Sequence, residues 1–405
     1  MWSLLRPSAS LASPKPCLAS AAMAPLTCSR DCARTSTAST RGRSALQRQV
    51  RSLTIETPGP QPRLASIQYL RAAAALGVLA FHAALTARSS FPVGAYGVTL
   101  FFVISGFVMV RITSEASRPL AFLADRLRRI VPVYWLVTFA GLAVSAALSG
   151  KFRFTATEVA ASLLFLPYGD PLPDRHYIPI IAVGWTLNYE MMFYAIFACG
   201  LLLPRSFQLV AVSAAFGALV LLGKIVRPTT APLEFWCAPI ILEFLAGMWL
   251  AAAVRPRGAD VPQWLAWGFL VALLLLVPRT VPAVLLLAGA LALEAKSRAP
   301  RWRLPLLLGD ASYSIYLWHL FAVTACAILV NRLHLPPSLI LPLGIAAGLA
   351  VGLAGYKLLE EPLLRLVRRD RGRAAGRAPR PGEPAGQTPA PPGVGPVQME
   401  SSPRT

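Results

Sequence analysis

The stretch Ile67-Gln-Tyr-Leu-Arg71-Ala-Ala-Ala-Ala-Leu-Gly-Val-Leu-Ala-Phe-His82 decides how this chain folds, because it opens the first strongly apolar segment yet carries an arginine and a histidine. Such a segment predicts a membrane-spanning helix. At about 100° per residue, Arg71 and His82 return to within about 20° of one direction and lie about 16 Å apart along the axis. Ionisable groups are costly inside a membrane, so this helix face is the first candidate site.

The rest of the composition agrees with a membrane protein. Of 405 residues, 55% are hydrophobic and only 14% are charged, against about 25% in soluble proteins. The net charge of +21 comes from lysines and arginines in short loops and both tails, which fits the positive-inside rule and gives no reason to expect a nucleic-acid partner. The six cysteines and four histidines lack metal-ligand spacing, so we expect no metal. These features predict an all-α, polytopic membrane bundle.

The chain divides into three parts. Residues 1–62 form a basic tail rich in Ala, Ser, Arg and Pro, which is either a targeting segment or the result of a mis-assigned start, since Met23 offers a second start. Residues 370–405 form a second tail rich in Pro, Gly and Arg, and we expect both tails to be disordered. Between them, residues 63–369 form the membrane domain. Its ten expected spans are 66–87, 95–113, 129–149, 183–203, 206–223, 233–254, 263–277, 280–295, 306–330 and 338–358.

Basic residues orient these spans. They cluster in the loop after the second span and in the loop after the eighth, and ten spans place both loops and both termini on the cytoplasmic side of a bacterial inner membrane. Only Pro278-Arg279 separates the seventh span from the eighth, so the two segments are alternatively one broken helix, which would put the tails on opposite sides. The apolar segment Thr157–Leu166 is too short to span and is expected to be re-entrant or interfacial.

Depth along the spans brings His82 and Glu190 together in the outer half of the membrane, each about 7–10 Å from the outer end of its span. A carboxylate beside an imidazole orients it and makes it more basic, which suits a general base. The alternative is a buried ion pair that only joins two helices. Arg71 lies near the inner quarter, where it either serves the site or snorkels to the headgroups.

Further polar residues complete the candidate site. Arg126 and Arg129 are three apart on one helix face and form a fork suited to phosphate, unless they are ordinary positive-inside charge. Four more residues are expected to line a substrate cavity: Ser105, Tyr189, Tyr316 and His319. Taken alone, Ser105-Gly106 favours close helix packing. Helix termination by Pro362 accounts for Glu360-Glu361-Pro362 without a function.

Taken together, these segments resemble the acyltransferase-3 family of integral membrane acyltransferases, and most of all its exopolysaccharide-production O-acyltransferase branch. The resemblance covers roughly residues 64–369 and rests on six stretches in family order: Gln68–His82, Gly97–Phe107, Arg126–Trp135, Gly184–Tyr194, Gly309–His319 and Glu360–Pro362. It implies a ten-helix bundle that moves an acyl group, often acetyl, from cytoplasmic acyl-CoA to a sugar hydroxyl of a glycan. The family's functional residues map onto Arg71, His82, Arg126, Arg129 and the acidic Glu190.

The resemblance implies a mechanism with two open forms. His82, held by Glu190, either takes the proton of the sugar hydroxyl or carries the acyl group itself. Arg126 and Arg129 would bind the CoA phosphates, and Arg71, Tyr316 or His319 would stabilise the oxyanion. Many relatives have Asp where this chain has Thr99, so either acceptor recognition differs or the threonine hydrogen-bonds in place of the carboxylate.

The sequence leaves other functions open. The chain is alternatively a transporter or flippase of glycans or lipids, although no internal repeat is evident. It is alternatively an acyltransferase for a lipid or another small acceptor, or a catalytically silent partner of a polysaccharide synthase. For the glycan acyltransferase, the expected partners are membrane lipid, a glycan acceptor and the polysaccharide synthesis machinery.

Overall fold

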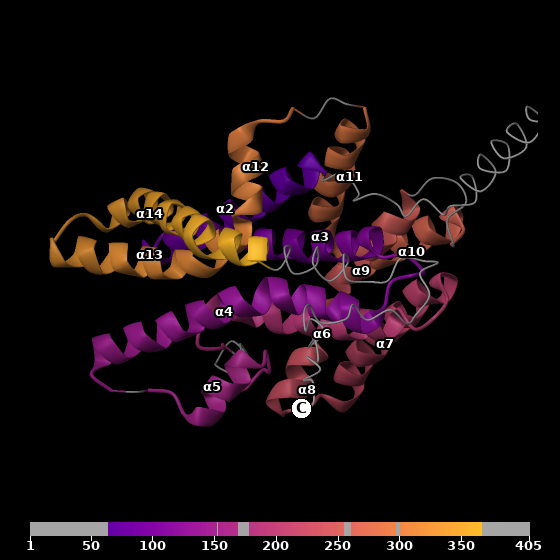
Figure 1. Cartoon of the computed structure of the whole chain (residues 1–405), viewed down its shortest axis with the longest axis horizontal. Helices are drawn as coiled ribbons and strands as arrows, with labels where there is room; N and C mark the ends of the chain where they lie inside the picture. The colour runs from indigo at the N-terminus through magenta and orange to yellow at the C-terminus, as the bar shows by residue number, and fades with distance from the viewer. Residues whose placement is uncertain (1–63, 152, 169–177, 255–260, 297–299, 367–405) are drawn as a thin grey trace, which may run out of the picture. The chain divides into compact units, whose positions relative to one another are not determined.

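The computed structural model describes residues 64–151, 153–168, 178–254, 261–296 and 300–366, and these residues form helices and connecting loops without a β-strand (Figure 1). This confirms the prediction of an all-α bundle. The two expected tails, 1–62 and 370–405, lie outside the described residues.

Several of the connections between the helices contain a turn of 3-10 helix. In chain order the helices are α2 (Ala65–Thr86), α3 (Tyr96–Ile112), α4 (Pro119–Ser149), α5 (Ala156–Leu163), α6 (Trp185–Gly200), α7 (Arg205–Val226), α8 (Ala231–Trp236), α9 (Leu242–Ala253), α10 (Gln263–Leu276), α11 (Val281–Ala295), α12 (Arg303–Asp310), α13 (Ser312–Arg332) and α14 (Ile340–Gly355). A π-helical turn, Tyr356–Glu360, extends α14.

Eight helical segments in the described part of the chain are long and apolar enough to cross a membrane. They are Ala65–Thr86, Pro92–Ile112, Pro119–Ser149, Arg205–Val226, Pro232–Ala253, Pro278–Ala295, Ser312–Arg332 and Pro337–Leu366, and each coincides with an expected span. The other two expected spans are shorter helices, since α6 has 16 residues and α10 has 14. Pro278 begins the short turn Pro278–Thr280 between α10 and α11, so these are two helices.

Two boundaries differ from the expected spans. The third span, expected at 129–149, begins at Pro119, because proline fits the first helical position. It ends at Ser149, and the next residue, Gly150, caps it with a left-handed φ of 67°. This N-terminal extension places Arg126 and Arg129 on one continuous helix. The ninth span, expected at 306–330, is split at Ala311 into α12 and α13.

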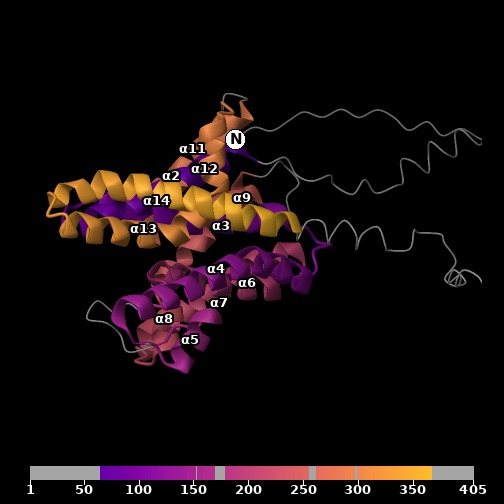
Figure 2. The same ribbon diagram turned by 60° about the vertical axis from the view of Figure 1, so that its left-hand side comes forward.

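Glycines bring α2, α13 and α14 together. Gly344, Gly348 and Gly352 recur every fourth residue, so they share one face of α14. A Cβ atom at Gly348 would lie 2.5 Å from Leu79 of α2, and one at Gly352 would lie 2.6 Å from the backbone of Ile315 in α13. Figures 1 and 2 both show α13 and α14 lying along each other. Small residues at helix contacts let the backbones approach closely.

A second close approach joins α3 to α9. A Cβ atom at Gly106 would lie 1.9 Å from the carbonyl oxygen of Phe244, and one at Gly247 would lie 1.8 Å from that of Val103. The expected packing role of Gly106 is therefore confirmed. The crossing is buried among large aromatic side chains, including Phe107 and Trp249, so it lies in the core of the bundle.

Replacing Gly247 with alanine is expected to destabilise the protein by about 1–3 kcal/mol, because the new methyl group meets the backbone of α3 and the helices must separate. Gly268→Ala is the matched control, since a Cβ atom at Gly268 of α10 meets nothing within 4 Å. Thermal unfolding of both variants in detergent measures the difference. Equal melting temperatures would contradict the close approach.

Candidate functional site

His82 of α2 faces His319 of α13. The Nδ1 atom of His82 lies 3.1 Å from the Nε2 atom of His319 and 3.0 Å from the carbonyl oxygen of Val78. The Nδ1 atom of His319 lies 3.1 Å from the carbonyl oxygen of Ile315. His319 is fully buried, whereas His82 is half-buried. The two histidines therefore form a contact pair, which we call the histidine pair.

The predicted pairing of His82 with Glu190 is wrong. Glu190 accepts hydrogen bonds from the Ser105 hydroxyl, at 3.1 Å, and from the Tyr194 hydroxyl. Depth along the spans places His82 and Glu190 at one height in the membrane, but it does not say in which direction each side chain points about its helix axis. In the fold, α2 packs on α3, α12, α13 and α14, whereas α6 packs on α4 and α7. His82 thus turns toward α13, and Glu190 turns toward α3.

Away from the histidine pair, α2 and α4 bring three arginines together. We call Arg71, Arg126 and Arg129 the arginine cluster. The charges of Arg129, Glu190 and Glu360 act on the guanidinium of Arg71. Arg126 interacts electrostatically with Arg129 and Glu190. The Nε atom of Arg126 is buried without a hydrogen-bond partner. Within the described residues Arg71 and Arg129 also make no hydrogen bond, so the cluster keeps donors for an anion.

Glu360 lies near this cluster, since its charge interacts with those of Arg71 and Arg129. Its carboxylate is buried and accepts a hydrogen bond from the Ser314 hydroxyl at 2.6 Å. The neighbouring Glu361 instead pairs with Lys357 and Arg365. The helix continues past Pro362 to Leu366, so the expected termination is wrong. The π-helical turn that precedes Pro362 changes the backbone register, a device frequent at functional sites.

The remaining predicted cavity residues fall in different places. Tyr316 lies beside the histidine pair, with its ring centre 6.1 Å from that of His319, and its hydroxyl donates to the carbonyl oxygen of Val183 at 3.0 Å. Tyr189 stacks on Phe235 at 3.8 Å and donates to that residue's carbonyl oxygen. Ser105 lies beside Glu190. The four residues therefore do not gather at one place.

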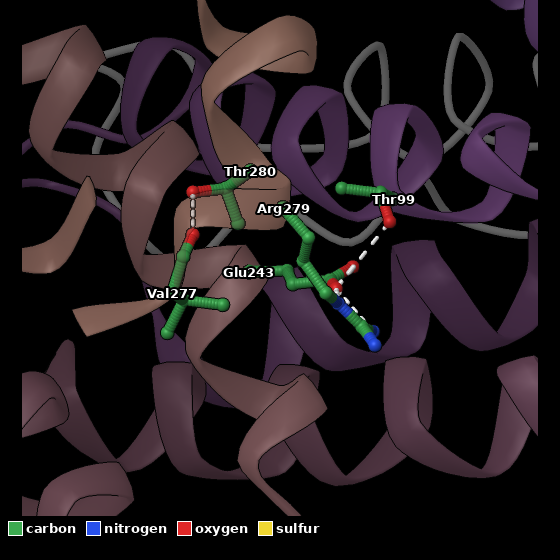
Figure 3. A network of polar contacts seen from close by, with 5 residues as sticks. All are labelled: Thr99, Glu243, Val277, Arg279 and Thr280. Atoms are coloured by element: carbon green, nitrogen blue, oxygen red, sulfur yellow. Dashed lines mark hydrogen bonds and ion pairs between the residues drawn. The ribbon is translucent and has the colours of Figure 1, made fainter. Parts of the chain in front are cut away.

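A polar network that sequence reasoning missed joins α3, α9 and the turn before α11. Glu243 is fully buried, and one of its oxygens accepts from the guanidinium of Arg279 and from the Thr99 hydroxyl at 3.3 Å. Figure 3 shows the Arg279 and Thr99 side chains converging on this carboxylate. Thr99 therefore donates a hydrogen bond to a carboxylate supplied by another helix. The available signal was a glutamate inside an apolar span.

Among the described residues no three His, Cys, Asp or Glu side chains lie close enough to hold a metal ion. The His82 imidazole can act as a base or a nucleophile, and the arginine cluster offers hydrogen-bond donors to an anion.

The chain matches known proteins over most of its length. A family described as "Acyltransferase domain" matches residues 64–357. The exopolysaccharide production protein ExoZ of Rhizobium meliloti (strain 1021) is 44% identical over 316 residues, which are 74% of this chain and 99% of that protein. No solved structure matches.

Proposed function

Because the chain belongs to the acyltransferase-3 family and is a membrane-embedded O-acyltransferase, we propose that it transfers an acyl group, acetyl in the first instance, from acyl-CoA to a sugar hydroxyl of an exported polysaccharide. The polysaccharide acceptor is suggested by the 44% identical relative, whose name assigns it to exopolysaccharide production. The observation that carries the proposal is the His82 ring, a half-buried base inside a membrane-spanning helix.

The reaction needs one proton acceptor. The sugar oxygen attacks the thioester carbonyl carbon while the Nε2 atom of His82 takes the hydroxyl proton. The tetrahedral intermediate then collapses, the carbon–sulfur bond breaks, and the CoA thiolate recovers the proton. Alternatively, the same nitrogen attacks the thioester first, releases CoA and passes the acyl group to the sugar. Both forms require an unprotonated Nε2 atom.

The arginine cluster suits the donor. Arg71 and His82 lie on one face of α2 and are separated by about 16 Å along its axis, so Arg71 is too far away to stabilise an oxyanion at His82. We assign Arg126 and Arg129 to the phosphates of CoA. We assign Arg71 to the pantetheine part of CoA, which lies between these phosphates and the thioester. With this assignment the donor binds from the cytoplasmic side, and both chain termini are cytoplasmic in a bacterial inner membrane, as the positive-inside rule requires.

The proposal is tested with membranes that contain the full chain, acetyl-CoA labelled in its acetyl group and the host's own polysaccharide. The expected result is release of CoA thiol together with alkali-labile label in the polysaccharide, since esters are cleaved by alkali. Label in the lipid fraction alone would replace the glycan by a lipid acceptor. Absence of thiol release would support a transporter and overturn the proposal.

Replacing both Arg126 and Arg129 with alanine is expected to raise the KM for acetyl-CoA by tenfold or more, because a hydrogen bond to a charged group contributes about 1.5–3 kcal/mol. Arg128→Ala is the matched control on the same helix, since that side chain is exposed and its only ion pair among the described residues is with Asp125 at 3.8 Å. The measurement is thiol release against acetyl-CoA concentration. A KM equal to that of the control would remove the phosphate role.

A further inference from the structure

Two backbone carbonyls fix where the protons of the histidine pair lie. The Nδ1 atom of His319 is 3.1 Å from the carbonyl oxygen of Ile315, and the Nδ1 atom of His82 is 3.0 Å from that of Val78. A carbonyl oxygen only accepts hydrogen bonds, so both Nδ1 atoms carry hydrogen. In a neutral imidazole the other nitrogen then has a lone pair. The Nε2 atom of His319 is therefore an acceptor, and the single Nδ1–H of His82 is shared between this atom, at 3.1 Å, and the carbonyl oxygen of Val78.

The opposite arrangement is excluded by repulsion. If the Nε2 atom of His319 donated to His82, both neutral rings would present an Nδ1 lone pair to a carbonyl oxygen at 3.0–3.1 Å. At each site the lone pair of the ring nitrogen would then face a lone pair of the carbonyl oxygen at hydrogen-bond distance, which is electrostatically unfavourable. The neutral pair consequently adopts one tautomer on each ring, and the Nε2 atom of His82 is left unprotonated.

We propose that His319 is a positioning residue that acts through His82. Its Nε2 atom holds the Nδ1–H of His82, fixes the tautomer that presents a basic Nε2 atom to the substrate, and retains that hydrogen bond when His82 becomes an imidazolium. The inference rests on the proposed function, in which His82 is the base. It assigns to a neutral imidazole the task that an acidic group performs in Ser-His-Asp sites.

The surroundings of the histidine pair favour a positioning role for His319 over a role in stabilising an oxyanion. Both nitrogens of His319 are engaged, so it has no free N–H for an oxyanion. Within the described residues, no carboxylate hydrogen-bonds to either ring of the pair. His319 is fully buried on α13 and has Tyr316 one turn before it. Gly352 of α14 lies against the backbone of Ile315, one turn before His319, so helix packing positions this part of α13.

The test compares His319→Phe with His319→Gln in the full chain in membranes. Phenylalanine keeps a flat ring of similar size but offers no acceptor, whereas the glutamine carbonyl can accept from the Nδ1–H of His82. We expect His319→Phe to lower kcat by about 10–100-fold with an unchanged KM for acetyl-CoA, and His319→Gln to recover part of that loss, since one oriented hydrogen bond is involved. A matching loss in both variants, or a change in KM alone, would overturn the proposal.

A double variant separates this inference from the proposed function. If His319 acts through His82, adding His319→Phe to His82→Ala causes no further loss, because the two residues work as a unit. Independent, multiplied losses would show a merely structural role and overturn the inference. If His82→Ala is inactive while His319→Phe keeps wild-type kcat, the inference alone fails. If His82→Ala is fully active, the base of the proposed function fails instead.

Discussion

Membranes that contain His82→Ala are expected to transfer acetyl groups about 10²–10⁴-fold more slowly than wild type, because positioned general-base help accounts for a rate factor of that size. The side chain is half-buried and lies near the C-terminal end of α2, so its removal leaves the helix contacts of Leu79 and Ala83 in place. The amount of protein in the membrane should therefore be unchanged. Incorporation of alkali-labile label from labelled acetyl-CoA measures the rate.

The control for this experiment lies one turn away on the same helix. The Thr86 hydroxyl donates to the carbonyl oxygen of His82 at 2.7 Å and is exposed, so Thr86→Ala changes a nearby side chain without removing the imidazole. We expect near wild-type transfer from this variant. Full activity of His82→Ala at normal protein levels would show that the base is another group.

Arg279→Met is expected to destabilise the protein more strongly than Gly247→Ala does. The substitution removes the cation that pairs with the fully buried carboxylate of Glu243. The second oxygen of that carboxylate already lacks a hydrogen-bond partner. An uncompensated buried charge costs about 3–5 kcal/mol, and the lower end applies because Arg279 is half exposed. Thermal unfolding in detergent measures the loss.

The paired variant Glu243→Met plus Arg279→Met provides the control. Replacing a whole buried ion pair with apolar side chains is often neutral or stabilising, so the double variant should recover most of the stability that Arg279→Met loses. If the two variants unfold at the same temperature, the loss comes from the turn before α11, and the pairing drawn in Figure 3 is not its cause.

The sequence was sufficient for those features that depend on one helix at a time. Hydropathy located most of the span ends within a few residues, and the glycine at 106 correctly predicted a close helix contact. It misplaced the start of α4, because polar turns at the membrane surface continue a helix without any hydrophobic signal. The sequence also predicted that the last span ends at Pro362. The π-helical turn that accommodates this proline has no recognisable local pattern.

The partners of the polar groups were beyond sequence reasoning. A helix gives each side chain a height and a direction about its own axis, but the neighbour it meets depends on how whole helices are rotated and packed. Glu190 was expected beside His82 and lies instead beside Ser105 and Tyr194. The partner of Glu243 has no local signal either, because its cation is 36 residues later in the chain.

By itself, then, the sequence determined a polytopic helical membrane protein with an acyltransferase resemblance and a histidine on its first span, since hydrophobicity and helical period are local properties. Only the tertiary structure decided which group orients that histidine. The glycine face of α14 lets α13 pack closely with α2 and α14. This packing places the Nε2 atom of His319 3.1 Å from the Nδ1 atom of His82. Packing between residues 237 positions apart has no signal in either segment alone, because close approach depends on the shapes of both helices.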